Sequence, residues 1–422
     1  MPAFEQETDL DGIASVLQDV ALRMQDNYPY AHPLYAGQML KPPHPVARLA
    51  YMLAMWVNPN NHALDGGRAS SEMEKEAVAA IAAMYGWKDR HLGHLTSGGT
   101  MANLEALWIA GNLHAGKKVL ASSQAHYTHS RISAVLKLPF ESVACDQQGR
   151  LDITDLRTKL ERGDVGTVVA TLGTTGAGAV DPLPEILSLR EEFEFRIHVD
   201  AAYGGYFLLA DNLGSDSRAS FDCIDRVDSI VVDPHKHGLQ PYGCGCILFR
   251  DPAVGRIYDH DSPYTYFSSD ELHLGEISLE CSRAGASAVA LWATQRLLPM
   301  TRDGEFAQGL SKCRAAALEL HRRLRADDDQ LTVFEPELDI VIWAPGGRRG
   351  SEISRRSSTV FDKAAEKNLH LALVKLPADL LRSYWPDVGF DEETVTCLRS
   401  CLMKPEHEGW LDEIWRILKD IS

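Results

Sequence analysis

The stretch Val231-Val232-Asp233-Pro234-His235-Lys236-His237-Gly238 is an apolar run that ends in charged residues. A second stretch upstream, Ile197-His198-Val199-Asp200-Ala201-Ala202, has the same form. Such a pattern is typical of a buried parallel strand whose carboxyl end carries chemistry. Because the two runs offer a carboxylate and a lysine, they predict that Asp200 and Lys236 are functional side chains at two strand ends.

From about Gly93 onward, short apolar runs alternate with helical segments, which is typical of α/β units on a largely parallel sheet. The predicted strands are Lys118–Ala121, Val168–Leu172, Ile197–Asp200, Ser229–Val232 and Cys246–Arg250. The predicted helices are Met101–His114, His129–Leu136, Asp152–Glu161, Leu183–Glu192, 285–300 and Glu305–Arg325.

Three parts follow from this pattern: an N-terminal helical segment (1–85), a large α/β domain (86–305) and a small α+β domain (306–422). The N-terminal helices are predicted at 8–30, Val46–Trp56 and 70–85. The last part has predicted strands at Leu338–Trp343 and Leu369–Leu376 and a closing helix at Trp410–Ile421. Pro345–Ser358, rich in Gly, Arg and Ser, is predicted to be a surface loop.

The composition is that of a globular protein: 422 residues, a formal net charge of −17 and 45% apolar side chains. This acidic balance argues against binding to nucleic acid or to an anionic membrane. Residues 1–7 lack the apolar core of a signal peptide, and no run reaches the ~18 apolar residues of a membrane span. The eight cysteines lack zinc-site spacing, so we expect a cytoplasmic protein with reduced thiols and no metal.

The turn Thr96-Ser97-Gly98-Gly99-Thr100-Met101-Ala102-Asn103 lies between an apolar run and a predicted helix. Glycines let backbone N–H groups approach a phosphate, and a helix N-terminus adds free N–H groups. Gly99 and Thr100 are therefore candidate phosphate ligands, although such turns also cap helices without a ligand. No Gly-Lys-Ser/Thr follows, which disfavours a P-loop nucleotidase.

Two histidines, His126 and His129, lie three residues apart at the start of a predicted helix. A metal pair is conceivable, but no third ligand is nearby in the sequence. The alternatives are an imidazole that stacks on a flat cofactor and a polar cluster at a helix start. Small residues in Thr171–Gly178 leave room for a ligand above another strand end, although an ordinary strand exit has the same composition.

Asp200 and Lys236 together suit pyridoxal 5'-phosphate (PLP), which needs a lysine amine and an acid that faces its pyridine nitrogen. An ionised carboxylate keeps the ring protonated, and Ala201 and Ala202 are small enough to lie flat under it. Desolvation at a strand end makes a lysine amine nucleophilic. Either residue alone could instead belong to a structural ion pair.

The motifs in this order resemble the group II PLP-dependent amino acid decarboxylases, a family of the aspartate aminotransferase superfamily with the fold-type-I architecture. The resemblance runs from about His32 to the C-terminus and implies a mostly parallel seven-stranded sheet with helices on both faces. It also implies PLP as the cofactor and a homodimer with the active site at the interface. The matching segments are His32-Pro33, Asn58-Pro59-Asn60, Ser97–Leu104, His126-Tyr127-Thr128, Gly173-Thr174-Thr175, His198–Gly205, Asp233–Lys236 and Ser282–Gly285.

The resemblance implies a role for each matching residue at the cofactor ring. Lys236 is implied as the lysine of the internal aldimine and Asp200 as the partner of the pyridine nitrogen. His126 is implied as the imidazole stacked on one face of the ring, with Ala202 on the other.

At the phosphate end, the resemblance implies Gly99, Thr100 and His235 as ligands, and Thr174 as a residue that lines the cofactor. Asp233 stands where many family members have Asn. A carboxylate beside a phosphate repels it unless another group compensates.

The implied reaction is decarboxylation of an L-amino acid to the amine and CO2 through an external aldimine and a quinonoid. In the aromatic branch a loop tyrosine protonates the α-carbon, and Tyr264 or Tyr266 is the candidate here. Both tyrosines could instead pack in a dimer interface.

The substrate, aromatic or acidic, stays undecided from the sequence. Gln38 stands at the position of a Gln in the acidic-substrate branch, whereas Asp233–Gly238 is more similar to archaeal tyrosine or aspartate decarboxylases. A distal carboxylate would need a buried cation, for which Arg68 and Arg283 are candidates, and Arg283 could equally be structural. His62 is a candidate substrate contact or a loop-fixing residue.

Two other functions are compatible with the same frame. One is a PLP-dependent carbon–carbon lyase, or decarboxylation coupled to deamination or aldol chemistry. The other is a non-catalytic scaffold with the PLP fold, against which the intact Lys236, Asp200 and His126 argue.

Overall fold

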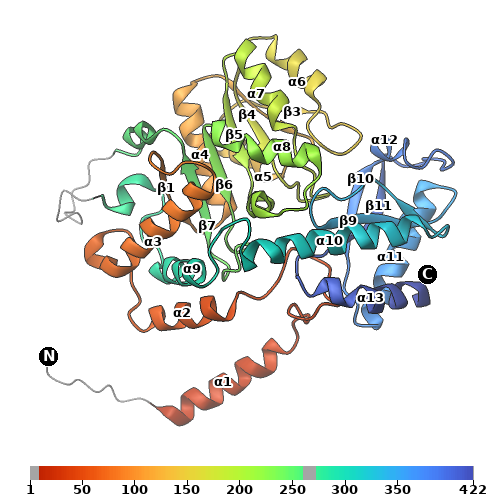
Figure 1. The fold of residues 1–422 in the computed structure, drawn as a ribbon, viewed down its shortest axis with the longest axis horizontal. Helices are drawn as coiled ribbons and strands as arrows, with labels where there is room; N and C mark the ends of the chain where they lie inside the picture. The colour runs from red at the N-terminus through yellow and green to blue at the C-terminus, as the bar shows by residue number, and fades with distance from the viewer. Residues whose placement is uncertain (1–8, 260–271, 422) are drawn as a thin grey trace.

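The computed structural model describes residues 9–259 and 272–421, and its largest part is an α/β unit that joins a smaller C-terminal unit (Figure 1). Three N-terminal helices come first: α1 (Leu10–Met24), α2 (Pro45–Met55) and α3 (Leu64–Met84). Within the described ranges, no helix combines the length and hydrophobicity needed to cross a bilayer.

The large unit is built on a seven-stranded sheet with the order β1-β7-β6-β5-β4-β2-β3. Its strands are β1 (Leu92–Thr96), β2 (Lys118–Ser122), β3 (Phe140–Val143), β4 (Val165–Thr171), β5 (Arg196–Asp200), β6 (Ser229–Val232) and β7 (Gly245–Phe249). Only β7 runs against its neighbours β1 and β6, while β6, β5, β4, β2 and β3 pair in parallel. The predicted mostly parallel seven-stranded sheet is confirmed.

Helices cover both faces of this sheet, which explains why its strands are continuous apolar runs. On β6, Val231 packs with Ala102 and Ala106 of α4, whereas Ile230 and Val232 lie in the core cluster of the opposite face. The α-helices of this unit are α4 (Gly99–Leu113), α5 (Thr128–Val135), α6 (Ile153–Leu160), α7 (Leu183–Glu192), α8 (Ser215–Asp222) and α9 (Gly285–Leu297). The 3₁₀ helices are η1 (Gly205–Leu209), η2 (Ile224–Arg226), η3 (Pro252–Ile257) and η4 (Leu274–Ile277).

The smaller unit is an antiparallel sheet, ordered β10-β11-β9-β8, with α10, α11 and α13 packed against its strands or against each other. Its strands are β8 (Gln330–Thr332), β9 (Ile340–Pro345), β10 (Ala372–Pro377) and β11 (Thr394–Cys401). Its helices are α10 (Glu305–Arg325), α11 (Gly350–Glu366), α12 (Ala378–Leu381) and α13 (His407–Ile421).

The predicted surface loop at Pro345–Ser358 is wrong from Gly350 onward, where α11 begins. Ile353, Val360 and Ala364 are buried at helical spacing, so an apolar stripe outweighs the Gly- and Ser-rich start. The predicted closing helix and the two predicted strands of this unit overlap α13, β9 and β10.

The register of the large sheet decides where its functional side chains meet. Thr171 of β4 pairs with Asp200 of β5, and Asp200 pairs with Val231 of β6. The carboxyl ends of β4, β5 and β6 therefore lie level, and the residues that follow each strand face one edge of the sheet.

Candidate active site

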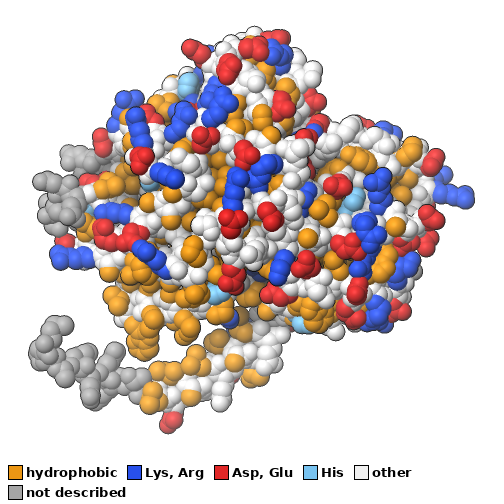
Figure 2. Space-filling view, in the orientation of Figure 1, with side chains coloured by type: hydrophobic (Ala, Val, Ile, Leu, Met, Phe, Trp, Pro, Cys, Tyr) orange, Lys and Arg blue, Asp and Glu red, His pale blue; other side chains and the backbone are white. Residues whose placement is uncertain are grey.

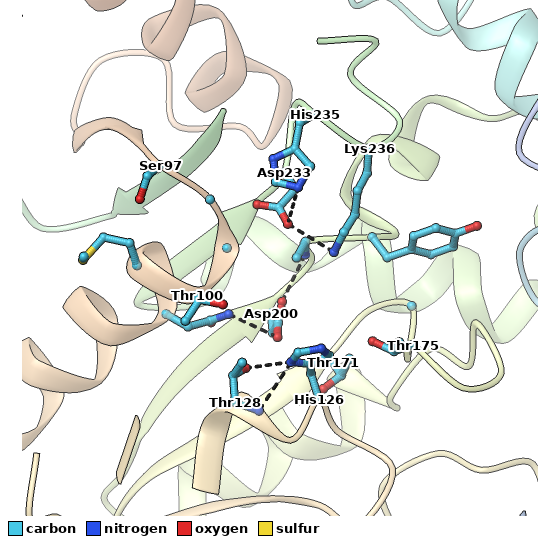
Figure 3. Close-up of a pocket in the computed structure, with 17 residues that line it drawn as sticks. Ser97, Thr100, His126, Thr128, Thr171, Thr175, Asp200, Asp233, His235 and Lys236 are labelled. Carbon is cyan, nitrogen blue, oxygen red and sulfur yellow. Dashed lines mark hydrogen bonds and ion pairs between the residues drawn. The ribbon is translucent and has the colours of Figure 1, made fainter. Parts of the chain in front are cut away.

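A cavity of about 300 Å³ lies at this edge, between the strand ends and the first turn of α4 (Figure 3). Thr171, Asp200 and Lys236 line it from three neighbouring strand ends. Ligands of α/β proteins bind at such a place, where parallel strands end. Lys236 and Asp200, 36 positions apart in the sequence, thus face one cavity.

The Asp200 carboxylate is buried and held by three donors. His129 Nε2 lies 2.8 Å from Oδ2, Asn103 Nδ2 lies 3.4 Å from the same oxygen, and the backbone N–H of Ala202 donates to Oδ1 at 3.1 Å. Burial alone would raise the pKa of Asp200, but the hydrogen bond and charge of His129 and the charge of Lys236 hold it well below its usual range. Asp200 is therefore ionised at neutral pH.

His129 is the important residue whose role the sequence did not reveal. It is buried on α5, one turn after His126, and its ring meets Asp200 (Oδ2) rather than a metal. The spacing from His126 was the available signal, but only the fold shows that α5 begins beside β5. No group of three or more candidate metal ligands occurs in the described parts of the chain.

Behind Asp200, a buried polar chain supports the donors. Asn103 accepts a hydrogen bond at Oδ1 from His198 Nε2 at 2.8 Å, and Ser229 Oγ lies 2.9 Å from His198 Nδ1. Burial, with the nearby charge of His129, lowers the pKa of His198 to about 3. The neutral ring of His198 therefore orients Asn103 without adding a charge.

His126 lines the cavity from the segment just before α5 and is partly exposed. Its Nδ1 lies 2.8 Å from Thr128 Oγ1, which fixes the ring orientation. Burial, the largest cause, lowers the pKa of His126, so the imidazole is neutral at pH 7. A neutral, oriented ring at the cavity wall suits contact with a flat ligand.

Lys236 extends into the cavity, and its Nζ forms an ion pair with Asp233 Oδ2 at 3.1 Å (Figure 3). Asp233 Oδ2 also lies 3.5 Å from His235 Nε2. His235 Nδ1 lies 2.8 Å from the carbonyl oxygen of Cys244, so the hairpin before β7 orients this imidazole. A lysine, a carboxylate and an imidazole thus meet at one end of the cavity.

The glycine turn before α4 forms the adjacent wall. Gly98 has a φ of +153°, and a Cβ on Gly99 would lie 2.8 Å from an oxygen of Asp233. A side chain at Gly99 therefore does not fit unless Asp233 moves. Thr100 and Met101, also at the cavity, begin the 15-residue helix α4, whose first N–H groups have no intrahelical partners.

Thr174, predicted to line the cofactor, is buried beside the cavity without lining it. Its hydroxyl accepts a hydrogen bond from the N–H of Ala179 at 3.0 Å. The residues of this loop that line the cavity are Gly173 and Thr175. Gly173 has a φ of +103°, and a Cβ there would lie 2.8 Å from the Gly204 nitrogen.

Three of the predicted substrate residues lie elsewhere. Arg283 forms a buried ion pair with Glu74 at 3.0 Å, which suits a structural role. Arg68 is exposed and lies 3.7 Å from Asp65, and His62 Nε2 lies 3.8 Å from Cys281 Sγ. The predicted proton donors, Tyr264 and Tyr266, lie outside the described residues.

Gln38 is linked to the cavity residue Thr175 through an arginine that the sequence did not single out. Arg399, buried on β11, donates from Nη2 to Gln38 Oε1 at 2.7 Å and from Nη1 to the carbonyl oxygen of Thr175 at 2.8 Å. Its Nε has no hydrogen-bond partner among the described residues. The small unit thus brings a buried cation into contact with Thr175, a residue that lines the cavity.

The residues of the cavity fit PLP. Asp200 is an ionised carboxylate for a pyridine nitrogen, Lys236 offers an amine, and the glycine turn at α4 offers N–H groups to a phosphate. Two buried atoms at the cavity, Thr171 Oγ1 and Asp233 Oδ1, have no partner within the described part of the chain. Orphaned polar atoms of this kind are expected where a ligand belongs.

Comparison with known sequences and structures points the same way. Residues 7–344 match the family described as the pyridoxal-dependent decarboxylase conserved domain. A probable L-tyrosine/L-aspartate decarboxylase of Methanothermobacter thermautotrophicus is 31% identical over 73% of this chain and 82% of its own length. An L-tyrosine decarboxylase of Enterococcus faecium is 28% identical over 76% of this chain and 68% of its own.

The fold has close counterparts among solved structures. Mouse CSAD superposes with a TM-score of 0.83 at 19% identity, over 100% of this chain and 89% of that one. Oryza sativa TDC, solved with PLP and tryptamine, gives a TM-score of 0.83 at 17% identity, with the same two shares covered. At such identities the likeness establishes the shared architecture.

Proposed function

Because the chain belongs to the pyridoxal-dependent decarboxylase family, we propose that the strand-end cavity is its active site and that Lys236, Asp200 and His126 carry the reaction. The protein is an amino acid decarboxylase that uses PLP. The observation that carries the proposal is that Asp200 and Lys236 face one cavity beside the α4 turn.

PLP, when bound, supplies an electron sink for the electron pair that stays behind as CO2 leaves. Asp200, ionised and buried, would stabilise a proton at the pyridine nitrogen, and His126 and Ala202 would contact the ring. Gly99 and Thr100 bind the phosphate with the first N–H groups of α4. Lys236 would hold the cofactor through its side-chain amine.

The substrate carboxylate, in this proposal, docks against Arg399. Its Nε is buried without a partner, and its two other nitrogens are fixed by Gln38 and Thr175. A buried cation oriented in this way favours a carboxylate through charge-assisted hydrogen bonds. Both aromatic and acidic amino acids carry an α-carboxylate, and only the acidic ones carry a second.

Arg399→Met separates these two cases, because a hydrogen bond to a charged group is worth about 1.5–3 kcal/mol. If Arg399 binds a distal carboxylate, we expect kcat/KM to fall roughly 10–100-fold for L-aspartate and little for L-tyrosine. If it binds the α-carboxylate, both fall. Unchanged kcat/KM for every substrate would contradict the proposal, and Arg68→Met, at an exposed arginine, is the matched control.

Decarboxylation itself is tested with the purified protein, PLP and a panel of amino acids: the standard twenty, cysteine sulfinate and dihydroxyphenylalanine. We expect CO2 and the matching amine in equal amounts for one or a few substrates. An aldehyde formed without CO2 would indicate a carbon–carbon lyase instead.

We also propose a cytoplasmic homodimer. No residue of α1 is buried, and this helix stands away from the rest of the chain (Figure 1). Apolar side chains gather on α1 and α2 in Figure 2, and Trp56 at the end of α2 is 90% exposed. Exposed apolar faces on two neighbouring helices suit contact with a second copy of the chain. The eight free cysteines suit a reducing compartment.

Light scattering tests the dimer, for which we expect twice the mass of the chain. Leu53→Asp, on the exposed face of α2, should shift the mass toward that of one chain because a charge there opposes apolar packing. A fully active wild-type monomer would contradict the dimer.

A further inference from the structure

The phosphate end of the cavity holds a carboxylate of its own. Asp233 is 3% exposed, and its Oδ2 lies 3.1 Å from Lys236 Nζ and 3.5 Å from His235 Nε2. Its Oδ1 has no partner among residues 9–259 and 272–421. Figure 3 shows Asp233, His235 and Lys236 together at the end of the cavity near Ser97.

This carboxylate faces the turn that we propose for the phosphate. A Cβ built on Gly99 would lie 2.8 Å from Asp233 Oδ2 and 2.9 Å from Oδ1, and one on Gly98 would lie 3.5 Å from His235 Cε1. A phosphate at the first turn of α4 would therefore be close to a carboxylate. Two neighbouring anions disfavour each other unless a positive charge or a proton joins them.

Few groups near this place can supply that charge. The amine of Lys236 already forms an ion pair with Asp233. Glu280 adds a negative charge beside the turn, where its carboxylate accepts the N–H of Ser97 at 2.9 Å. In Figure 3, His126 lies on the far side of Asp200 from Asp233. Four further groups stay uncharged at pH 7 because burial raises their pKa values: Tyr206, Tyr242, Cys244 and Cys246.

We propose that the Asp233–His235 pair takes up one proton when the cofactor phosphate enters, so that this protein binds its cofactor together with a proton. The inference rests on the proposed function, which assigns the phosphate to Gly99 and Thr100. Without ligand, His235 is neutral at pH 7 because burial lowers its pKa. A phosphate next to Asp233 gives the imidazole two anions to bridge, which favours its protonated form.

Proton uptake determines the direction in which the affinity for PLP changes with pH. A ligand that binds with one extra proton binds more weakly as the pH rises, by up to about tenfold per pH unit. Asp233→Asn removes the second anion, and with it the reason for uptake. We therefore expect this variant to bind PLP more tightly than wild type at pH 8, by roughly tenfold, with a flatter pH profile.

Calorimetry measures the proton directly. Apo wild type and Asp233→Asn are titrated at pH 8 in two buffers of different ionisation enthalpy, with PLP and with pyridoxal, which lacks the phosphate. We expect wild type to take up about one more proton with PLP than with pyridoxal, and Asp233→Asn to show no such excess. His235→Gln should also lose the excess.

The ligand pair keeps the test decisive even if a variant fails to fold, because wild type alone reports the phosphate-specific proton. Equal uptake for PLP and pyridoxal in wild type would overturn the inference, and so would an excess that persists in folded Asp233→Asn. A failure of wild type to bind PLP at all would instead overturn the proposed site.

Discussion

Asp200 and Asp233 are carboxylates at the ends of neighbouring strands, and their surroundings differ. Asp200 accepts from His129, Asn103 and the Ala202 N–H, and its ionised form is strongly favoured. Asp233 has one close cation, Lys236, and an oxygen without a partner in the described parts of the chain. A carboxylate with several donors is a fixed charge, whereas a carboxylate with a single close cation leaves room for its neighbours to change their protonation when a ligand binds.

The largest expected effect comes from neutralising the fixed charge. Asp200→Asn keeps the size of the side chain but cannot hold the proton on a pyridine nitrogen, so we expect kcat to fall on the order of 10²–10³-fold. PLP binding, measured by dialysis and absorbance, should survive because Lys236 and the α4 turn remain. Activity within a few-fold of wild type would contradict the claim that Asp200, unlike Asp233, acts as a fixed negative charge.

A smaller effect is expected at His129, whose ring contacts Asp200. His129→Gln keeps a donor for Asp200 but removes the imidazole charge, so the pKa of Asp200 should rise and kcat should fall roughly 10–100-fold. Because the pKa of Asp200 is lower in the folded protein than in the unfolded chain, the ionised carboxylate stabilises the fold at neutral pH. This contribution to the free energy of unfolding is lost as the pH falls through the folded-state pKa.

The acid limb of the pH–rate profile is the readout that a merely structural role of His129 would not move. We expect this limb to shift to higher pH in His129→Gln. A uniform drop in rate at an unchanged limb would mean that His129 only supports the fold. Gln is preferred to Ala as the substitution because it leaves no cavity beside Asp200.

The smallest effect is expected at Asn103, whose bond to Asp200 is long at 3.4 Å. Asn103→Ala should lower kcat only a few-fold, whereas stability should fall by about 1–3 kcal/mol because the buried ring of His198 loses its acceptor. Urea denaturation followed by fluorescence measures this loss. A loss of kcat as large as that of Asp200→Asn would show that this 3.4 Å hydrogen bond stabilises the ionised form of Asp200 more than its length suggests.

The sequence was sufficient to predict the parallel sheet and the placement of Asp200 and Lys236 at neighbouring strand ends, because both depend on local patterns at strand ends. It did not predict the role of His129, since a histidine on α5 meets Asp200 only through the packing of α5 beside β5. Arg399 was missed for a similar reason: it comes from β11, 199 positions after Asp200, and no local pattern marks it. The helix α11 was missed because its first residues have the composition of a loop.

The most direct test of the central claim is to locate the cofactor on the chain. The holoenzyme is reduced with borohydride, which makes the link between cofactor and lysine permanent, and is then digested and analysed by mass spectrometry. We predict the added mass on the peptide that contains Lys236 and a complete loss of this label in Lys236→Ala. A label on another lysine, or an unlabelled chain with bound PLP, would contradict the account.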